Sequence, residues 1–190
     1  MISLLHQAQV YVRKVLPKGG IAVDATVGNG NDTLFLAETV GEAGWVYGFD
    51  IQAQAIQITT KRLKKAGQVK QVHLVQYPHQ KPWSAVIPER FFGKIDAVMF
   101  NLGYLPHGNR SIITRPNSTI TACRQALKWL KPRGLMTLML YNGHEGGQEE
   151  AENVIAWSRQ LQADRYLTML HQSPNRLHAP MLMVIGKLKN

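Results

Sequence analysis

Short apolar runs alternate with amphipathic segments along most of this chain. Seven runs have the length and the content of β-branched and aromatic residues that buried strands show. They are Ile21–Ala25, Trp45–Phe49, Val72–Gln76, Ile95–Asn101, Leu135–Tyr141, Tyr166–His171 and Met181–Lys187. Helical spacing of apolar positions predicts helices over Asp32–Val40, Gln52–Ala66, Ser118–Leu130 and Gln148–Leu161, with a short helix within Pro82–Phe92. The alternation predicts an α/β fold in which helices wrap a mostly parallel sheet whose strands are buried on both faces.

Both ends of the chain depart from this alternation. The segment Ile2–Leu16 places apolar residues on one helical face, interrupted by Arg13 and Lys14, and predicts an amphipathic helix that ends before Pro17. This pattern differs from that of a signal peptide. The last two predicted strands are joined by Gln172–Ala179, which has no helical pattern. We therefore expect these two strands to form an antiparallel pair.

Composition narrows the class of protein. The chain has 190 residues, 45% of them hydrophobic, and no linker-like or repetitive tract, which fits a single domain over residues 1–190. Its one cysteine, Cys123, leaves no intrachain disulfide, and no apolar run approaches the ~20 residues that span a bilayer. These features predict a cytoplasmic protein without a membrane partner. The net charge of +10 at pH 7 favours nucleic acid as a partner over an indifferent basic surface.

The segment Asp24–Thr33 connects the first predicted strand to a helix through Gly28 and Gly30. A strand that ends in an acid and turns through two glycines is typical of a nucleotide-cofactor loop, because glycine lets backbone N–H groups approach a ligand closely. Asn31 or Asp32 would cap the helix. Asp50 ends the next strand, 20 residues beyond Gly30, where a carboxylate accepts hydrogen bonds from ribose hydroxyls. These features fit a dinucleotide or S-adenosylmethionine.

Two details favour S-adenosylmethionine as the ligand of this loop. Thr33 stands where a dinucleotide-binding loop has a third small residue. Asp24 places negative charge at the entry of the loop, which suits a cationic sulfonium ligand better than a pyrophosphate. A phosphate-binding P-loop is excluded because no Gly-Lys-Ser/Thr follows.

The fourth predicted strand delivers Asn101 and then Tyr104 into a loop. An asparagine carbonyl, together with a nearby backbone carbonyl, can accept both hydrogens of an amine and direct its lone pair toward a methyl donor. Tyr104 is placed to stack on a base or on the donor. An ordinary strand-to-loop turn with a buried tyrosine is the alternative interpretation.

Candidate proton acceptors lie at the same edge of the sheet. His144 follows the fifth strand, and an imidazole titrates near neutrality. An equally good interpretation is that His144 forms hydrogen bonds that stabilise the glycine-rich turn around it. His107, just after Pro106, is a second candidate. Glu149 and Glu150, at the start of the next helix, are interpreted as partners of the helix dipole.

Basic and aromatic residues at this edge are candidates for contact with RNA. The basic run at positions 61–65 fits a solvated helix face instead. Candidates for phosphate contact are Arg110, Arg115, Arg176 and His178. Candidates for stacking on an unpaired base are Tyr104, Tyr141 and Trp83. Trp129 and Trp157 fall within helices and are expected in the core.

Four segments together resemble one small family of class I S-adenosylmethionine-dependent methyltransferases. They are Asp24–Thr33, Asn101–Pro106, Thr114–Thr119 and Tyr141–Gly147. The family was long grouped as rRNA methylases and includes the bacterial tRNA 5-aminomethyl-2-thiouridine methyltransferases (MnmM, YtqB-like). Asn101-Leu-Gly-Tyr104 also resembles the Asn-Pro-Pro-Tyr motif of amino-methyltransferases, with Leu102 and Gly103 in place of the prolines.

The resemblance implies a Rossmann-like fold with a seven-stranded sheet and an antiparallel last strand, S-adenosylmethionine as cofactor, and no metal. It implies transfer of a methyl group to the aminomethyl nitrogen of a wobble uridine in the anticodon of tRNA. Methylation of rRNA or of another RNA, and a non-catalytic RNA-binding module with a relic cofactor pocket, are the alternatives.

The residue patterns and the resemblance together predict roles for particular residues. The catalytic residues would be Asn101, Tyr104 and His144. The cofactor would be bound by Asp24, Thr26, Gly28, Asn29, Gly30, Asn31, Asp32, Thr33, Asp50, Ile51, Gln52, Tyr77, His79 and Asn101. The substrate would be bound by Tyr104, His107, Arg110, Arg115, Tyr141 and Arg176.

Overall fold

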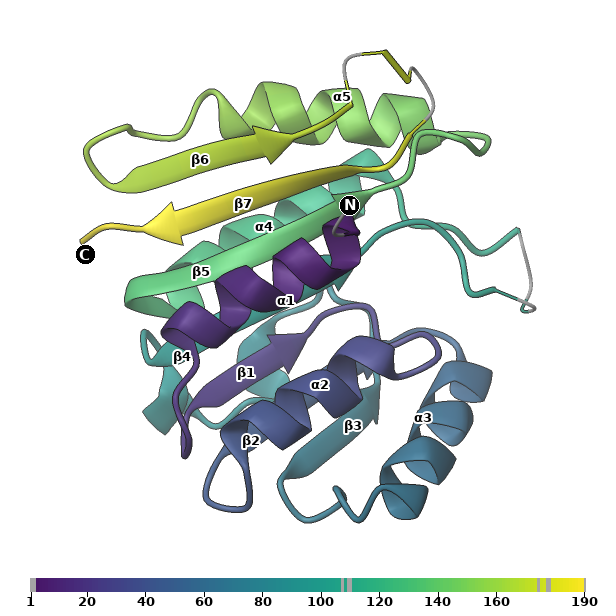
Figure 1. Cartoon of the computed structure of the whole chain (residues 1–190), viewed down its shortest axis with the longest axis vertical. Coiled ribbons are helices and arrows are strands. Elements are labelled where there is room, and N and C mark those ends of the chain that lie inside the picture. The colour runs from purple at the N-terminus through teal and green to yellow at the C-terminus, as the bar shows by residue number, and fades with distance from the viewer. Residues whose placement is uncertain (1–2, 107, 109–110, 174, 177–178, 190) are drawn as a thin grey trace.

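A seven-stranded sheet forms the centre of the computed structural model, which describes residues 3–106, 108, 111–173, 175–176 and 179–189 (Figure 1). Its strands are β1 (Ile21–Asp24), β2 (Trp45–Asp50), β3 (Val72–Gln76), β4 (Ile95–Asn101), β5 (Leu130–Leu140), β6 (Tyr166–His171) and β7 (Met181–Lys187). Their order across the sheet is β3-β2-β1-β4-β5-β7-β6. Strands β1 to β5 pair in parallel, and β7 pairs antiparallel with both β5 and β6. The predicted mostly parallel sheet and its antiparallel last strand are confirmed.

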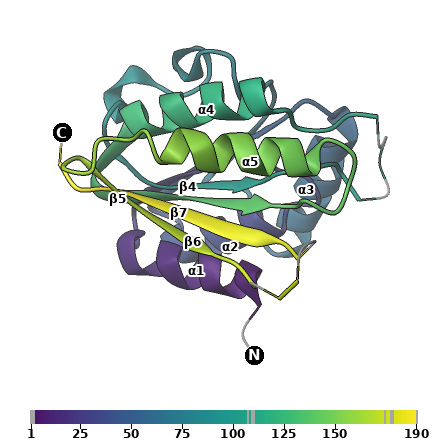
Figure 2. The same ribbon diagram turned by 90° about the horizontal axis from the view of Figure 1, so that it is seen from above.

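Helices cover both faces of this sheet (Figure 2). They are α1 (Leu4–Val15), α2 (Asn31–Val40), α3 (Ala53–Lys65), α4 (Pro116–Trp129) and α5 (Gly147–Ser158). Helices α1 and α2 lie on one face, and α4 and α5 lie on the other. Helix α3 packs against α2, β2 and β3. No helix among the described residues is long and apolar enough to cross a membrane.

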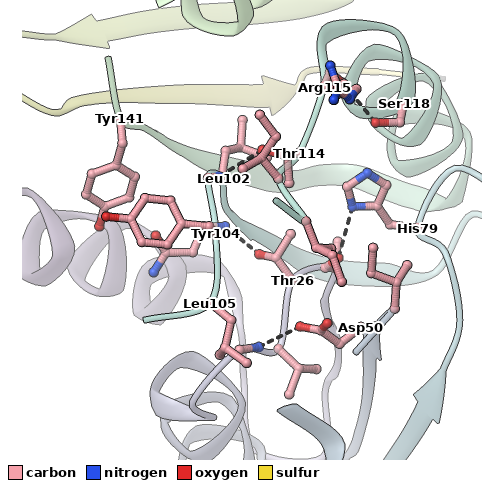
Figure 3. A pocket seen from close by; sticks show the side chains of 18 of the residues that line it. Thr26, Asp50, His79, Leu102, Tyr104, Leu105, Thr114, Arg115, Ser118 and Tyr141 are labelled. Carbon is pink, nitrogen blue, oxygen red and sulfur yellow. Dashed lines mark hydrogen bonds between the residues drawn. The ribbon is translucent and has the colours of Figure 1, made fainter. Parts of the chain in front are cut away.

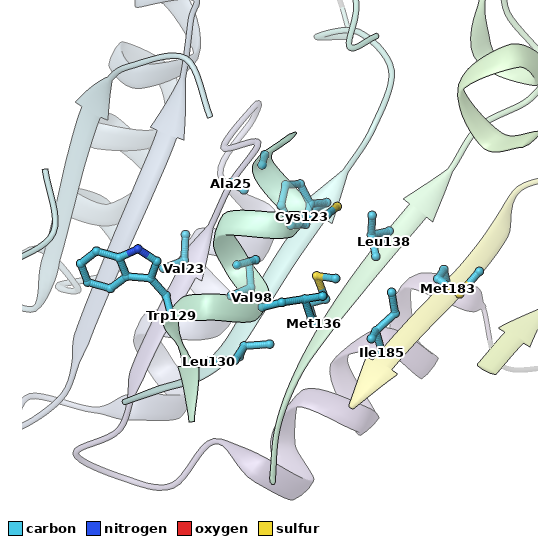
Figure 4. Close-up of a cluster of buried hydrophobic side chains, with 14 of the residues drawn as sticks. Val23, Ala25, Val98, Cys123, Trp129, Leu130, Met136, Leu138, Met183 and Ile185 are labelled. Carbon is cyan, nitrogen blue, oxygen red and sulfur yellow. The ribbon is translucent and has the colours of Figure 1, made fainter. Parts of the chain in front are cut away.

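The two-residue period of the strands divides the core into two layers. On β4, Val98 and Phe100 point into the layer beneath α4 and α5, whereas Ala97 and Met99 point into the layer beneath α1 and α2. Figure 4 shows the first layer, in which strand side chains lie against α4 at Cys123. The central strands are therefore buried on both faces, as predicted. The edge strands β3 and β6 are only partly buried, since each has a neighbouring strand on one side alone.

The structure corrects three predicted element boundaries. Strand β5 begins at Leu130 rather than Leu135, because Leu130 pairs with Ile95 immediately after α4 and the register shifts before the rest of the strand. Helix α4 accordingly spans Pro116–Trp129. The short helix expected within 82–92 consists of two 3-10 turns, Trp83–Ala85 and Glu89–Phe91. The remaining boundaries agree with the predictions to within a few residues.

Candidate functional site

A cavity of about 1100 Å³ opens at the carboxyl ends of the central strands (Figure 3). Ligands of open α/β sheets bind at this edge, beside the point where the strand order reverses, which here lies between β1 and β4. The predicted site residues that line the cavity are Thr26, Gly28, Asn29, Asn31, Asp32, Asp50, Ile51, Gln52, Tyr77, His79, Asn101, Tyr104, Arg115, Tyr141 and His144. Three others are buried behind this lining, namely Asp24, Gly30 and Thr33. Arg176 does not line the cavity, and His107, Arg110 and His178 lie outside the described residues.

The glycine loop has the backbone conformation that its sequence predicts. Gly28 and Gly30 have φ of 51° and 76°, in the left-handed region that favours glycine. A Cβ atom on Gly30 would lie 2.5 Å from Oγ1 of Thr59, whose hydroxyl donates a hydrogen bond to the carbonyl of Gly28. Helix α3 therefore packs directly against the loop. Gly30 is the N-cap residue of α2 and no side chain caps this helix, so the predicted capping by Asn31 or Asp32 is wrong.

Asp50 joins the end of β2 to the glycine loop. Its Oδ2 accepts a hydrogen bond from the backbone N–H of Gly28 at 2.9 Å, and its Oδ1 accepts one from the N–H of Gln52 at 2.9 Å. Burial raises the pKa of Asp50, and these backbone hydrogen bonds lower it. Each carboxylate oxygen can accept a second hydrogen bond, so the side chain can also receive the two hydroxyls of a ribose.

Asp24 is fully buried at the end of β1. Its Oδ2 accepts a hydrogen bond from the hydroxyl of Thr33 at 2.6 Å, and its Oδ1 accepts one from the N–H of Thr26 at 3.2 Å. Burial and, next, the negative charge of Asp32 raise the pKa of Asp24 to about 7. Within the described part of the chain, no lysine or arginine forms an ion pair with Asp24, Asp32 or Asp50. Asp24 therefore presents no exposed oxygen to the cavity, and its charge is the property through which it can influence a ligand there.

Asp32 and Asn101 link the acidic side of the cavity to the end of β4. The backbone N–H of Asn101 donates to Oγ1 of Thr26 at 2.6 Å, and its Nδ2 donates to Oδ2 of Asp32 at 3.3 Å. Burial raises the pKa of Asp32, while hydrogen bonds from Asn101 and from Gln9 of α1 lower it. Because Nδ2 is directed to Asp32, Oδ1 of Asn101 is the atom that remains to accept a hydrogen bond from a ligand.

An aromatic pair stands beside Asn101. The rings of Tyr104 and His144 meet edge to face, with their centroids 5.5 Å apart, and Tyr104 is 38% exposed. Nδ1 of His144 lies 2.9 Å from the carbonyl of Glu145, and because a carbonyl oxygen only accepts, Nδ1 is the donor. Nε2 is buried and has no hydrogen-bond partner among the described residues. It lies 3.3 Å from where a Cβ on Gly103 would stand.

One predicted contact residue, Trp83, has a structural role instead. Trp83 is fully buried, its Nε1 donates to the carbonyl of His79, and its ring packs against Phe49, so the predicted stacking of Trp83 on a base is wrong. His79 lies on the cavity floor, where its Nδ1 is 3.2 Å from the carbonyl of Ala25 and burial lowers its pKa. Trp129 and Trp157 are buried, as predicted.

The sequence did not predict the contacts of Glu150 or the place of Leu5. Glu150 is buried and accepts hydrogen bonds from the hydroxyls of Thr114 and Thr119, so its interpretation as a partner of the helix dipole is incomplete. Leu5 of α1 lines the cavity, and only the packing of α1 brings it there. The basic run on α3 is exposed, as predicted for a solvated face, and Arg115 is exposed at the cavity mouth. No group of three or more His, Cys, Asp or Glu side chains within the described ranges is arranged to hold a metal ion.

Comparison with known proteins finds close matches over nearly the whole chain. The family model described as "Putative rRNA methylase" matches residues 46–187. The tRNA (mnm(5)s(2)U34)-methyltransferase, chloroplastic, of Arabidopsis thaliana is 40% identical over 191 residues, which cover 96% of this chain and 69% of the relative. A solved structure from Clostridium thermocellum, described as a "putative rRNA-methylase", has 39% identity and a TM-score of 0.93, covering 99% of each chain. A "putative methyltransferase" from Streptococcus mutans, solved in complex with SAH, has 34% identity and a TM-score of 0.88, also covering 99% of each chain.

The packing around Gly30 generates a first prediction. In Gly30→Ala the new Cβ meets Thr59 and the residue must keep a left-handed conformation, which together destabilise the protein by at least about 2 kcal/mol. Chemical denaturation measures this change. Gly67→Ala is the matched control, because Gly67 has φ of 70° but nothing lies within 4 Å of its Cβ position. Equal losses in the two variants would contradict the contribution of the Thr59 contact.

The raised pKa of Asp24 generates a second prediction. Its carboxyl is protonated below about pH 7, so a cationic ligand should bind more tightly as the pH rises, by about tenfold between pH 6 and 7.5. The ligand-free protein should lose stability over the window from the ordinary value of 3.8 to about 7, because the folded state holds the proton more tightly than the unfolded chain. Calorimetric titration with S-adenosylmethionine measures the affinity. An affinity that does not change with pH, or the same pH dependence in Asp24→Asn, would contradict this account.

Proposed function

Because this chain belongs to the rRNA methylase family of S-adenosylmethionine-dependent methyltransferases, we propose that it methylates the primary amine of 5-aminomethyl-2-thiouridine at the wobble position of tRNA. The observation that carries the proposal is the orientation of Asn101, whose amide nitrogen is directed to Asp32 and whose Oδ1 is directed away from it. In this proposal, Oδ1 of Asn101 is the hydrogen-bond acceptor for the amine, beside the acidic side of the cavity.

The residues of the cavity suit the chemistry of the donor. S-adenosylmethionine supplies a methyl group activated by a positively charged sulfur. Asp50 is placed for the ribose hydroxyls, and the turn through Gly28 lies against it. Asp24 and Asp32 supply the negative charge that favours a sulfonium and an ammonium group, and Asp32 lines the cavity. The expected role of Asp24 at the amino-acid end of the donor is thus electrostatic.

The acceptor side must present a neutral amine. An alkyl amine is mostly protonated at pH 7, and enclosure in a cavity lowers its pKa because the charged form loses solvation. We assign the proton to His144, which lines the cavity and whose Nε2 has no hydrogen-bond partner among the described residues. Oδ1 of Asn101 then accepts a hydrogen bond from the neutral amine and directs its lone pair to the donor side. No covalent intermediate is required, and Cys123 is buried inside α4, where burial raises its pKa further.

The surroundings of the cavity suit an RNA substrate. Tyr104 and Tyr141 both line the cavity and offer faces for an unstacked base (Figure 3). Arg115 stands at the mouth, where a phosphate would pass. The net charge of +10 adds sequence-independent attraction. The wobble position belongs to the unpaired anticodon loop, whose bases can be splayed into such a cavity.

Nucleoside mass spectrometry tests the substrate. The purified protein and S-adenosylmethionine are incubated with tRNA that carries 5-aminomethyl-2-thiouridine, and in parallel with rRNA from cells that lack this gene. We expect one methyl group to be added to the aminomethyl nucleoside of tRNA, and cells that lack the gene should accumulate the unmethylated nucleoside. Methylation of rRNA with no change in tRNA would replace the proposal with the rRNA alternative. Absence of S-adenosylmethionine binding would leave only the non-catalytic RNA-binding module.

The orientation of Asn101 generates a third prediction. Asn101→Ala should keep donor affinity within about threefold and lower the rate of methyl transfer at least about 100-fold, because it removes the acceptor-positioning carbonyl and leaves the glycine loop intact. Calorimetry measures donor binding, and single-turnover assays measure transfer. Gln57→Ala, which removes an exposed amide of α3 outside the cavity, should be unchanged in both. A normal transfer rate in Asn101→Ala would refute the amine-holding role.

A further inference from the structure

Glu150 is a buried acid in the first turn of α5, with 3% of its surface exposed. Its Oε2 accepts a hydrogen bond from the hydroxyl of Thr114 and its Oε1 accepts one from the hydroxyl of Thr119, both at 2.6 Å. A carboxylate that only balanced a helix dipole would gain little from burial, because removing it from water is costly. We therefore look for the role of Glu150 in its two hydrogen bonds, to Thr114 and to Thr119.

Thr114 connects Glu150 to the loop that follows β4. Its hydroxyl has one hydrogen, and this hydrogen is donated to Glu150. Its oxygen accepts a hydrogen bond from the backbone N–H of Gly103 at 2.8 Å, and its own N–H donates to the carbonyl of Gly103 at 2.9 Å. Both backbone groups of Gly103 are thus bound by Thr114. The next residue, Tyr104, forms a β-bridge with Ile113.

Three successive backbone amides in this loop are held by three different parts of the fold. The N–H of Asn101 donates to Thr26, and the N–H of Leu102 donates to the carbonyl of Met139 in β5. The N–H of Gly103 has the hydroxyl of Thr114, which is itself oriented by Glu150. Gly103 has φ of 120°, a conformation that few other residues adopt, so its position depends on these bonds.

We propose that Glu150 is a positioning residue for the methyl acceptor. Through Thr114 and Gly103 it holds Tyr104 and the face of His144 in their places beside Asn101. Glu150 touches neither donor nor acceptor in this role. The inference rests on the proposed function, because the acceptor amine is the group that Asn101, Tyr104 and His144 surround.

A purely structural role is the competing explanation. Glu150 also binds Thr119, which lies inside α4, so it joins α4 to α5 whatever happens at Gly103. The two hydroxyls separate the explanations. Loss of the Thr114 hydroxyl breaks the connection to Gly103, whereas loss of the Thr119 hydroxyl breaks the connection between the helices and leaves the loop attached.

Hydrogen exchange of the Gly103 amide tests the connection without any substrate. In the ligand-free protein, Thr114→Val should speed this exchange at least about tenfold, because the amide loses its acceptor. Thr114→Ser keeps the hydroxyl and should restore protection. Glu150→Gln should also speed exchange, since an NH2 group, which cannot accept a hydrogen bond, replaces one of the two oxygens that receive the threonine hydroxyls. Glu152→Gln, an exposed change on the same helix, serves as the control.

Methyl transfer to tRNA tests the consequence. Thr114→Val and Glu150→Gln should each lower the single-turnover rate at least about tenfold with donor affinity within about twofold, and the double variant should be no slower than the slower single one. Thr119→Val should keep the rate within about threefold and lower only the melting temperature. The proposal would be overturned if Thr114→Val transferred the methyl group at the rate of the parent protein. It would also be overturned if Thr119→Val lost as much of this rate as Thr114→Val.

The variants remain informative if one of them does not fold. Thr114→Val against Thr114→Ser decides the question when Glu150→Gln is unstable, since valine and serine differ from threonine by one small group. A parent protein that does not methylate tRNA would refute the proposed function, while the exchange of Gly103 would still report whether Glu150 holds the loop. If the parent protein methylates tRNA but the Gly103 amide exchanges at the same rate in Thr114→Val as in the parent, the positioning role alone is refuted.

Discussion

A buried acid at the carboxyl end of β1, with two further acids beside it, is the constraint on which the site depends. Asp24 is fully buried, accepts hydrogen bonds from Thr33 and Thr26, and has Asp32 and Asp50 as like-charged neighbours. No cation of the described chain pairs with these three acids. Only a proton or a positively charged ligand can balance them, and this is the physical basis for a preference for a sulfonium donor over an anionic dinucleotide.

The same acids organise the acceptor side. Asp32 raises the pKa of Asp24 and also receives the amide of Asn101, so one carboxylate contributes to the donor site and orients the residue proposed to hold the amine. Strand β4 makes this coupling rigid because it lies between β1 and β5 and is buried on both faces. The end of such a strand is a well-defined position, which is what alignment of an amine with a methyl group requires.

The loop beyond Asn101 is held by side chains as well as by the sheet. Gly103 and Tyr104 have left β4, and their position comes from Thr114 and, through it, from Glu150. This connection spans β4, the start of α4 and the start of α5, so it assembles only when those helices pack together.

The sequence by itself determined the order of elements, the sheet class and the donor. Strand periodicity, helix boundaries and the glycine turn from Asp24 to Thr33 are local features, expressed by neighbouring residues wherever the segment lies. Only the tertiary structure decided the contacts between distant segments. Examples are the hydrogen bond from Asn101 to Asp32, 69 residues away, and the hydrogen bond from Thr114 to Glu150. The burial of Trp83 was decided in the same way. It also moved the start of β5 to Leu130, since a strand begins where its neighbour pairs with it. Such contacts depend on how the helices pack on the sheet, and no local pattern carries that information.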